Sequence, residues 1–313
     1  MAHHRRFRFG LQVRTPFDGL TWAETAQRVE ELGYSTLFLP DHFHQQWGPI
    51  AAMTAAAVST TTLKVGTLVF DNDYRHPVVL HKEMATIDMI SGGRLEVGIG
   101  AGWKRLDYTQ SGIVEDAPKV RVDRMMEGVA VLKGLFAEGP FCYSGEYYEI
   151  DGLDGLPEPH TAGGPPLIIA GGSRRMLRFA GANASIVGVN PSMHSGEVDA
   201  DAARDGMADR MDQKVAWVRE GAGARFDDLE INAWVPVAKV TDDSASFAEL
   251  LSPGFGVPAD QVLDSPMAIV GTVSEIADRL EERRERWGFS YHVVQDEAGA
   301  MEMAPVVASI GGR

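Results

Sequence analysis

The sequence predicts an α/β protein built from about eight strand–helix units. Short apolar runs that suit strands alternate with helix-like stretches along the whole chain, which is the pattern of a parallel sheet. The 313 residues can bury a large core, and no linker rich in proline, glycine, serine or charge divides them. We therefore expect one domain over residues 1–313. Eight parallel strands of this kind can close into a barrel or form an open, doubly wound sheet.

The first hundred residues supply four strands and three helices. A capping box of Thr21 and Glu24 opens a helix that Gly33 closes. An alanine-rich helix follows over 49–59, and Pro77 suits the first turn of another helix that ends at Gly92-Gly93. The strands expected between these helices are 8–13, 34–39, 63–70 and 95–99.

The rest of the chain supplies four more strands. Residues 119–136 carry apolar side chains, two of them methionines, at helical spacing, which indicates a core face. Residues 141–150 predict a hairpin outside the main sheet, and the acidic stretch 193–206 is typical of a mobile loop or lid. Residues 242–266 are irregular, with one or two short helices, and a second capping box at 272–275 opens the last large helix. The remaining strands are expected at 167–170, 185–189, 231–240 and 291–294.

The most informative segment is the hexapeptide Phe38-Leu39-Pro40-Asp41-His42-Phe43, where an apolar run ends in an acid beside an imidazole. Barrel enzymes place their chemistry at the carboxyl ends of their strands. Asp41 and His42 would therefore lie just past the end of a buried strand, as the candidate catalytic pair. The alternative is structural: Asp41 caps the following helix and His42 fills a polar gap.

Composition and charge exclude several classes of function. The formal net charge of -15 disfavours a nucleic-acid partner or an anionic membrane surface, because both need a basic face. No stretch approaches eighteen apolar residues and no signal peptide is recognisable, so a cytoplasmic location is expected. The single cysteine, Cys142, rules out an internal disulfide, and its setting between Phe141 and Tyr143 indicates packing.

Metal and nucleophile chemistry have little support in the sequence. The nine histidines are scattered, and the pairs His3-His4 and His42-His44 lack a third ligand at a suitable spacing, so no metal site is expected. No elbow motif supports a serine or cysteine nucleophile. The segment Gly98-Ile99-Gly100-Ala101-Gly102 follows the fourth expected strand and lacks the third glycine of a dinucleotide fingerprint, which disfavours the doubly wound sheet.

The order and spacing of several short motifs resemble the bacterial luciferase-like flavin and deazaflavin oxidoreductases, and the resemblance covers nearly the whole chain. Members of that family are TIM barrels, so the resemblance implies a (β/α)8 barrel with insertions. More narrowly, the chain is similar to a branch assigned to the deazaflavin coenzyme F420. The matching segments are Phe9-Gly10-Leu11-Gln12, Leu39-Pro40-Asp41-His42, Val65-Gly66-Thr67-Leu68-Val69, Arg75-His76-Pro77, Ser91-Gly92-Gly93-Arg94, Gly98-Ile99-Gly100-Ala101-Gly102-Trp103 and Ala170-Gly171-Gly172-Ser173.

One of these segments predicts an anion site. Gly171-Gly172-Ser173 ends an expected strand and opens a helix, so its N–H groups and the helix dipole favour an anion. Arg174, Arg175 and Arg178 add positive charge, and the resemblance implies that the flavin phosphate binds here. The alternative is an ordinary glycine turn beside solvated arginines. The resemblance adds Arg121 as a second phosphate contact, for which the alternative is a surface salt bridge.

The resemblance also implies where the tricyclic ring of the cofactor would lie. It places the ring against Gly100, Ala101 and Gly102, because glycine lets the backbone approach a flat ring closely. It implies a non-proline cis peptide bond near Leu68-Val69, behind the ring. The cofactor contacts that it implies from the first three strands are Gln12, Asp41, Thr67 and Leu68.

The substrate would lie on the far side of the ring, next to His44, Trp47 and Trp103. Sugar-phosphate dehydrogenases of the family carry a glutamate where this chain has Trp103, so a glucose-6-phosphate dehydrogenase role is not expected. The aromatic content of the surrounding loops suggests a partly apolar substrate. These loops are 43–48, 103–117 and 190–206.

The leading hypothesis is hydride transfer between coenzyme F420 and a small organic substrate. His42 is the expected acid–base group, because a neutral imidazole can pass a proton near working pH, and Asp41 would orient it or hydrogen-bond the cofactor. The alternative is a monooxygenase that uses reduced FMN and oxygen and needs a partner flavin reductase. A third hypothesis is a flavin-binding protein without catalysis. The resemblance also implies a homodimer.

Overall fold

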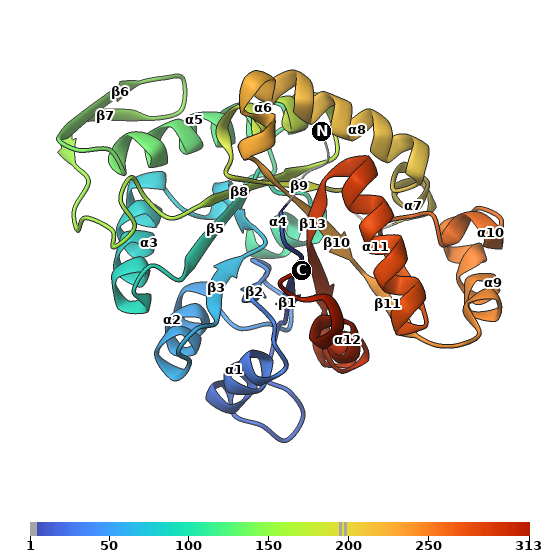
Figure 1. The fold of residues 1–313 in the computed structure, drawn as a ribbon. Coiled ribbons are helices and arrows are strands. Elements are labelled where there is room, and N and C mark those ends of the chain that lie inside the picture. Colours follow the sequence, from blue (N-terminus) through green and yellow to red (C-terminus); the bar gives the residue numbers. More distant parts are fainter. Residues whose placement is uncertain (1–4, 194–195, 197–198) are drawn as a thin grey trace.

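Parallel strands close into a barrel in the computed structural model of this chain (Figure 1). The structure describes residues 5–193, 196 and 199–313. The strand order is β3-β2-β1-β13-β10-β9-β8-β5, and a direct pairing of β3 with β5 completes the ring. The structure therefore confirms the expected barrel and rules out the alternative of an open, doubly wound sheet. The strands are β1 (Arg8–Gln12), β2 (Thr36–Leu39), β3 (Lys64–Thr67), β5 (Leu95–Gly100), β8 (Leu167–Gly171), β9 (Ile186–Val189), β10 (Glu230–Val235) and β13 (Phe289–Gln295).

Helices surround the barrel and begin where the sequence indicates (Figure 1). Thr21 and Thr272 both form complete capping boxes, and Gly92 ends its helix in the left-handed conformation. The surrounding helices are α1 (Trp22–Glu31), α2 (Pro49–Ser59), α3 (Pro77–Ser91), α5 (Pro118–Leu135), α6 (Arg174–Asn183), α8 (Ala208–Ala222), α11 (Val273–Trp287) and α12 (Asp296–Ile310). Helix α12 corrects the expectation that α11 is the last large helix; Pro305 within α12 obscures its pattern.

Two predicted strands are divided. The strand expected over 63–70 is divided into β3 and β4 (Phe70–Asp71), and the peptide bond between Leu68 and Val69 is cis, as the resemblance implies. The strand expected over 231–240 ends at Val235, because Pro236 has no N–H to continue the ladder. The chain then forms β11 (Val237–Val240), which pairs with β12 (Ala268–Gly271) in a separate two-stranded sheet.

Short elements fill the connections between the main strands and helices. The predicted hairpin forms from β6 (Pro140–Ser144) and β7 (Glu149–Asp154), but Cys142 on it is exposed and not packed. The stretch 242–266 forms two short helices, as expected. Of the expected lid 193–206, residues 194, 195, 197 and 198 lie outside the described residues. The remaining elements are the 3-10 turns η1 (Asn72–Tyr74) and η2 (Gly223–Asp228), and the helices α4 (Arg105–Ser111), α7 (Ala200–Asp205), α9 (Ser244–Phe255) and α10 (Ala259–Val262).

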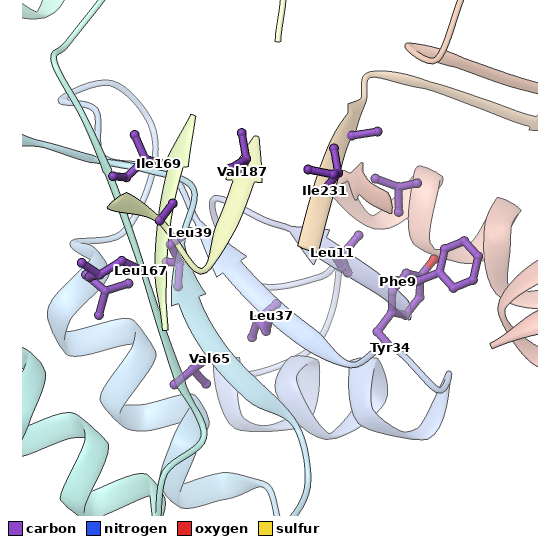
Figure 2. Packing of buried hydrophobic residues seen from close by; sticks show 14 of the residues in the cluster. Phe9, Leu11, Tyr34, Leu37, Leu39, Val65, Leu167, Ile169, Val187 and Ile231 are labelled. Carbon is purple, nitrogen blue, oxygen red and sulfur yellow. The ribbon is translucent and has the colours of Figure 1, made fainter. Parts of the chain in front are cut away.

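Side chains of the barrel strands alternate between two apolar layers. Outward-facing residues such as Leu37 and Leu39 pack against the helices (Figure 2). Phe38, between them in sequence, belongs to a smaller cluster inside the barrel. A Cβ on Gly10 or Gly66 would lie 2.9 or 2.8 Å from the Phe38 ring, so these glycines make room for it. Within the described residues, no helix is long and apolar enough to span a membrane.

A buried ionic cluster crosses the barrel at the amino ends of its strands. The Glu96 carboxylate is fully buried and lies 2.6 Å from Arg8, 3.1 Å from Lys64 and 3.0 Å from the Tyr291 hydroxyl. Arg8 also contacts Glu230, at 2.5 Å, and lies over the Tyr291 ring. Burial opposes the charged form of Glu96, but Arg8 and Lys64 outweigh it and hold the pKa of Glu96 below its ordinary value. The cluster joins five strands of the barrel.

We expect Glu96→Gln to lower the free energy of unfolding by about 3 kcal/mol, because it leaves the half-buried cations of Arg8 and Lys64 without their charge partner. Urea denaturation near neutral pH measures this change. The matched control is Glu31→Gln on α1, whose partner Arg28 is exposed, and its effect should be too small to resolve. Equal effects of the two substitutions would show that the cluster does not stabilise the barrel.

Candidate active site

The carboxyl ends of the strands bring most of the predicted site residues to one rim of the barrel. Asp41 and His42 follow β2, Leu68 follows β3, and Gly102 follows β5. On the other side of the ring of strands, Gly172 and Ser173 follow β8. Because all the strands run parallel, their ends share this rim, where barrel enzymes place their chemistry.

His42 has a carboxylate partner that the sequence analysis missed. Its Nδ1 atom lies 2.6 Å from Oδ2 of Asp107, which is buried in the first turn of α4. The imidazole also meets the Trp103 ring edge-on, with the ring centres 5.6 Å apart. Burial lowers the pKa of His42, while Asp107 opposes that effect. His42 is therefore a half-buried imidazole held by Asp107, and its catalytic role stays a prediction.

Asp41 pairs with an arginine and not with its neighbour. Its Oδ2 atom lies 2.5 Å from Arg75, its Oδ1 atom lies 3.2 Å from the second Arg75 nitrogen, and the Asp71 backbone N–H also donates to it. Such a two-point pair fixes both side chains. Of the two roles expected for Asp41, orientation of His42 therefore belongs to Asp107, and the cofactor contact stays a prediction. The helix-cap alternative for Asp41 is wrong, because Gly48 caps α2.

A buried carboxylate on β4, Asp71, forms a second polar group at the rim. Its Oδ1 accepts from the Asp73 backbone N–H at 2.9 Å, and its Oδ2 lies 3.0 Å from the Tyr108 hydroxyl. That hydroxyl also lies 3.1 Å from Asp73 Oδ2 and accepts from Arg121, so its single proton cannot serve both carboxylates. Burial raises the pKa of Asp71 to about 7. A proton on Asp71 would supply the missing donor.

Glycine is required at positions 98, 100 and 102, because neighbouring segments of the chain leave no room for a Cβ atom there. A Cβ on Gly98 would lie 2.1 Å from the Thr67 carbonyl oxygen, and one on Gly100 would lie 2.8 Å from Val69. Gly102 has a left-handed backbone, and a Cβ there would lie 1.9 Å from the Tyr108 hydroxyl. Close approach of β3, β4 and α4 therefore requires glycine at these positions, and the expected contact with a cofactor ring stays a prediction. Ala101 differs, since its carbonyl accepts from Arg121 at 3.4 Å.

Gln12, Thr67 and Leu68 are held in place on the first three strands. Gln12 donates to the Leu68 carbonyl at 2.6 Å and accepts from Gln295 at 2.8 Å, so a hydrogen-bonded chain links β13, β1 and the end of β3. The Thr67 hydroxyl donates to the Gly98 carbonyl at 3.0 Å. These residues lie where the resemblance expects cofactor contacts, and the contacts themselves stay predictions.

The predicted anion site begins a helix and borders a cavity. Ser173 caps α6 by accepting from Met176 N–H, and a Cβ on Gly172 would lie 2.5 Å from the Ser192 nitrogen. Buried Lys214 from α8 holds the two loops together through the carbonyls of Gly172 and Asn190 and through Asp205. The cavity measures about 430 Å³ and is lined by Gly172, Ser173, Arg174, Ser192, Asp199, Asp201, Asp205, Arg210 and Trp217.

The arginines after Ser173 are tied to acidic side chains on neighbouring helices. Arg174 lies 3.0 Å and Arg178 lies 3.4 Å from Glu220, and Arg175 pairs with Asp123. All three arginines are exposed, so solvated ion pairs describe them in this structure. Arg121 is different because it is buried, and its Nε atom has no hydrogen-bond partner among the described residues. The surface salt bridge considered for Arg121 is therefore wrong.

The three expected substrate-side residues lie on the loops after β2 and β5. Trp103 touches His42, and the exposed His44 ring centre lies 5.1 Å from that of His42. Trp47 is 45% exposed and leans on the buried Trp22 of α1. Whether these side chains contact a substrate stays a prediction. Lys104, which the sequence analysis did not single out, lies 3.0 Å from His44 Nδ1.

The fold also supplies the third ligand that the His42-His44 pair lacks in the sequence. The ligand atoms of His42, His44 and Asp107 all lie within 4.8 Å of one another, which a metal ion could exploit. The close His42–Asp107 contact and the Lys104 ammonium beside His44 occupy those atoms in this structure. The expectation of a missing third ligand is therefore corrected, while the absence of a metal role stays a prediction.

Four residues of the rim were missed from the sequence: Asp107, Arg75, Asp71 and Lys214. Arg75 lies in a segment that matches the family, and the acidic pair of Asp71 and Asp73 directly follows the third expected strand, so both carried a usable signal. Asp107 lies in a loop assigned only to the substrate. Lys214 looks like one more polar residue of an ordinary helix, and nothing in the sequence marks it as buried.

A family model and several curated relatives show which family of proteins this chain resembles. A family model for the luciferase-like monooxygenase matches residues 15–214. An F420-dependent glucose-6-phosphate dehydrogenase of Rhodococcus hoagii is 28% identical over 237 residues, 71% of this chain and 66% of that protein. A 4-hydroxyprotoasukamycin monooxygenase of Streptomyces nodosus subsp. asukaensis is 25% identical over 299 residues, 85% of this chain and 76% of that protein.

A solved structure has the same fold. The coenzyme F420-dependent tetrahydromethanopterin reductase from Methanopyrus kandleri superposes with a TM-score of 0.74 at 20% identity, over 98% of this chain and 98% of that one. At this level of identity the likeness shows the fold alone. The barrel and its insertions are therefore shared with an enzyme of different sequence.

We expect Asp71→Asn to remove part of the pH dependence of stability. Asp71 has a pKa of about 7 in the folded chain and its ordinary pKa of 3.8 in the unfolded chain, so wild-type stability falls as the pH rises between these values. An asparagine amide can donate to Tyr108 and accept from Asp73 N–H at every pH. Urea denaturation at about pH 5 and about pH 8 measures the free energy of unfolding. The value of the variant relative to that of the wild type should be higher at about pH 8 than at about pH 5.

The exposed Asp227 of η2 provides the control for this comparison. Asp227→Asn should leave the difference between the two pH values unchanged. If Asp71→Asn behaves in the same way as this control, Asp71 is ionised in the folded protein at neutral pH.

Proposed function

Because this chain belongs to the luciferase-like monooxygenase family, we propose that it is an oxidoreductase that transfers hydride between coenzyme F420 and a small organic substrate. One observation carries the proposal: a buried carboxylate holds an acid–base histidine on the same barrel rim as a glycine-rich helix start suited to a phosphate. The F420-dependent dehydrogenase among the relatives supports this choice of cofactor.

The residues on the rim fit an anionic, flat cofactor. Ser173 and the free N–H groups of α6 face a cavity that Arg174 and Arg210 also line, which suits a phosphate. On the other side, the buried Nε of Arg121 lacks a partner among the described residues and lies on the helix beneath Ala101 and Gly102. Asp41, Gln12, Thr67 and Leu68 would border the ring between these two places.

The chain's own contribution to the reaction is to position a proton. When bound, the deazaflavin supplies a carbon that gives or takes hydride and reacts poorly with oxygen. His42 would exchange a proton with the substrate, Asp107 would keep the imidazole in place, and Trp103 would limit the access of water from one side. His44 and Trp47 would line the substrate pocket, whose aromatic walls favour a partly apolar molecule.

A second candidate function is an FMN-dependent monooxygenase that uses reduced flavin and oxygen. The specific observation in its favour is the alignment to the 4-hydroxyprotoasukamycin monooxygenase, which extends over more of this chain than the alignment to the dehydrogenase does. A flavin reductase would then have to supply the reduced cofactor. Under either function, we propose a homodimer in the cytoplasm.

We expect the purified protein to bind F420 more tightly than FMN. Separate titrations that follow quenching of each cofactor's fluorescence measure the two dissociation constants. Because the proposed phosphate cradle is common to both ligands, the difference should come from the ring end of the site. Tighter binding of FMN would instead favour the monooxygenase and direct the search to a partner reductase.

We expect His42→Ala to retain F420 binding and to lower turnover by about 100-fold or more, because it removes the proton donor and leaves the cofactor site in place. The matched control is His160→Ala, a substitution of an exposed histidine beside Gly93 at the amino end of the barrel. Single-turnover absorbance changes of F420 with a reactive substrate provide the measurement. Unchanged turnover in His42→Ala would remove the assigned role.

A further inference from the structure

We infer that Asp107 is a positioning residue that fixes the tautomer of His42, so that Nε2 is the nitrogen that exchanges a proton with the substrate. This inference rests on the proposed function in assigning a substrate, but the tautomer is a property of the protein alone. It assigns a role to a buried carboxylate 65 residues from the histidine that it contacts.

The Asp107 carboxylate collects three donors from two separate segments of the chain. Its Oδ2 atom lies 2.6 Å from His42 Nδ1 and 3.4 Å from the Tyr74 hydroxyl. Its Oδ1 atom lies 3.4 Å from the backbone nitrogen of Phe43. Asp107 itself is 3% exposed and lies in the first turn of α4, where the helix dipole favours a negative charge. An ionised carboxylate only accepts hydrogen bonds, so every one of these partners must donate to it.

This arrangement decides which ring nitrogen carries hydrogen. A neutral imidazole has one N–H, and the nitrogen beside a carboxylate keeps it. Nδ1 of His42 is therefore the donor, and Nε2 carries the lone pair. Among the hydrogen bonds of the described residues, Nε2 has no partner, and it is not an orphaned buried atom either. The reactive nitrogen is thus free to meet a ligand at the rim.

The other charged groups around His42 cannot take this role. Asp41, its sequence neighbour, has both carboxylate oxygens committed to Arg75. His44 and Lys104 face each other at 3.0 Å, and Lys104 is a cation that would repel a protonated His42. Trp103 meets the imidazole edge-on and limits rotation of the ring. Asp107 is therefore the one carboxylate of the described residues that contacts the His42 ring.

A carbonyl compound and its alcohol differ by one hydride and one proton, so this pair illustrates what His42 would do. In the reductive direction, the carbonyl carbon receives hydride from the reduced coenzyme, and the C=O π pair moves to the oxygen. That oxygen takes the proton from Nε2–H of protonated His42, which becomes neutral and keeps its Nδ1–H toward Asp107. In the oxidative direction, Nε2 of neutral His42 would remove the hydroxyl proton, the O–H electron pair would form the C=O π bond, and hydride would pass from the carbon to the oxidised coenzyme. The Asp107 charge stabilises the imidazolium in both directions.

The first test is ¹⁵N nuclear magnetic resonance of the ligand-free protein, which distinguishes the two tautomers by the chemical shifts of the ring nitrogens. His42→Gln identifies which signals belong to His42. We expect the Nδ1–H tautomer in the wild type. Asp107→Asn should reverse it, because an amide N–H donates to Nδ1 and leaves the proton on Nε2. Asp41→Asn is the matched control and should leave the tautomer unchanged.

The second test is kinetic. Asp107→Asn should lower kcat by about 100-fold or more through the wrong tautomer, as such a change does in serine-protease triads, whereas Asp107→Glu should restore part of it. The limb of the pH profile that reports His42 is the acidic limb in the oxidative direction and the alkaline limb in the reductive direction. It should move to lower pH in Asp107→Asn, since Asp107 raises the pKa of His42 against the effect of burial. A loss of fold alone would not move this limb.

The two tests separate this inference from the proposed function. A wild-type Nε2–H tautomer, or an unchanged tautomer in Asp107→Asn, would overturn the role of Asp107 even if the protein turns over F420. Conversely, the expected tautomers without any F420 binding would support the role of Asp107 and contradict the proposed cofactor.

Discussion

The fully buried charge of Glu96 is the constraint on which the barrel depends. A carboxylate in the interior of a barrel is stable only if cations and donors reach it, and here they come from β1, β3 and β13. These contacts cross the inside of the barrel, so a shift of any one strand by one residue would turn its contributing side chain outward. The registers of the strands are thereby linked, and the carboxyl ends reach the rim at fixed positions.

The rim repeats the same principle, because most of its acidic side chains are paired with basic side chains. Asp41 is committed to Arg75, Asp107 to His42 and Asp205 to Lys214. In a chain of net charge -15, such pairing keeps neighbouring carboxylates from repelling one another. Asp71 is the exception, since it lies beside Asp73 and Tyr108 with no cation of its own, and burial raises its pKa to about 7. The division of partners leaves His42 Nε2 and Arg121 Nε uncommitted at the rim.

Features that depend on a few adjacent residues were predictable from the sequence. Contacts between residues far apart in the sequence were not, because they depend on how the whole chain folds. Capping by Thr21 and Thr272 and the strand end before Asp41 depend on a few adjacent residues. The partner of His42 depends on where the loop after β5 places Asp107, and no local pattern records that. Pro236 did carry a signal, since it cannot continue a ladder, yet its strand was predicted to run through it. The glycines of 98–102 were singled out for a cofactor contact, and the structure adds a second reason for them, the close approach of neighbouring segments.

The predicted anion site carries less unpaired positive charge than the three arginines beside it in the sequence suggest. Three arginines near Ser173 suggest a strongly positive pocket, but Glu220 pairs with two of them and Asp123 with the third. Two features remain that would attract a phosphate. One is the start of α6, with its N–H groups and its dipole, and the other is the exposed arginines, whose carboxylate partners a ligand could displace. Lys214 contributes by geometry, because it holds the carbonyls of Gly172 and Asn190 away from the incoming anion. The predicted site would therefore offer an acidic cofactor backbone dipoles, since most of the side-chain charge around it is already paired.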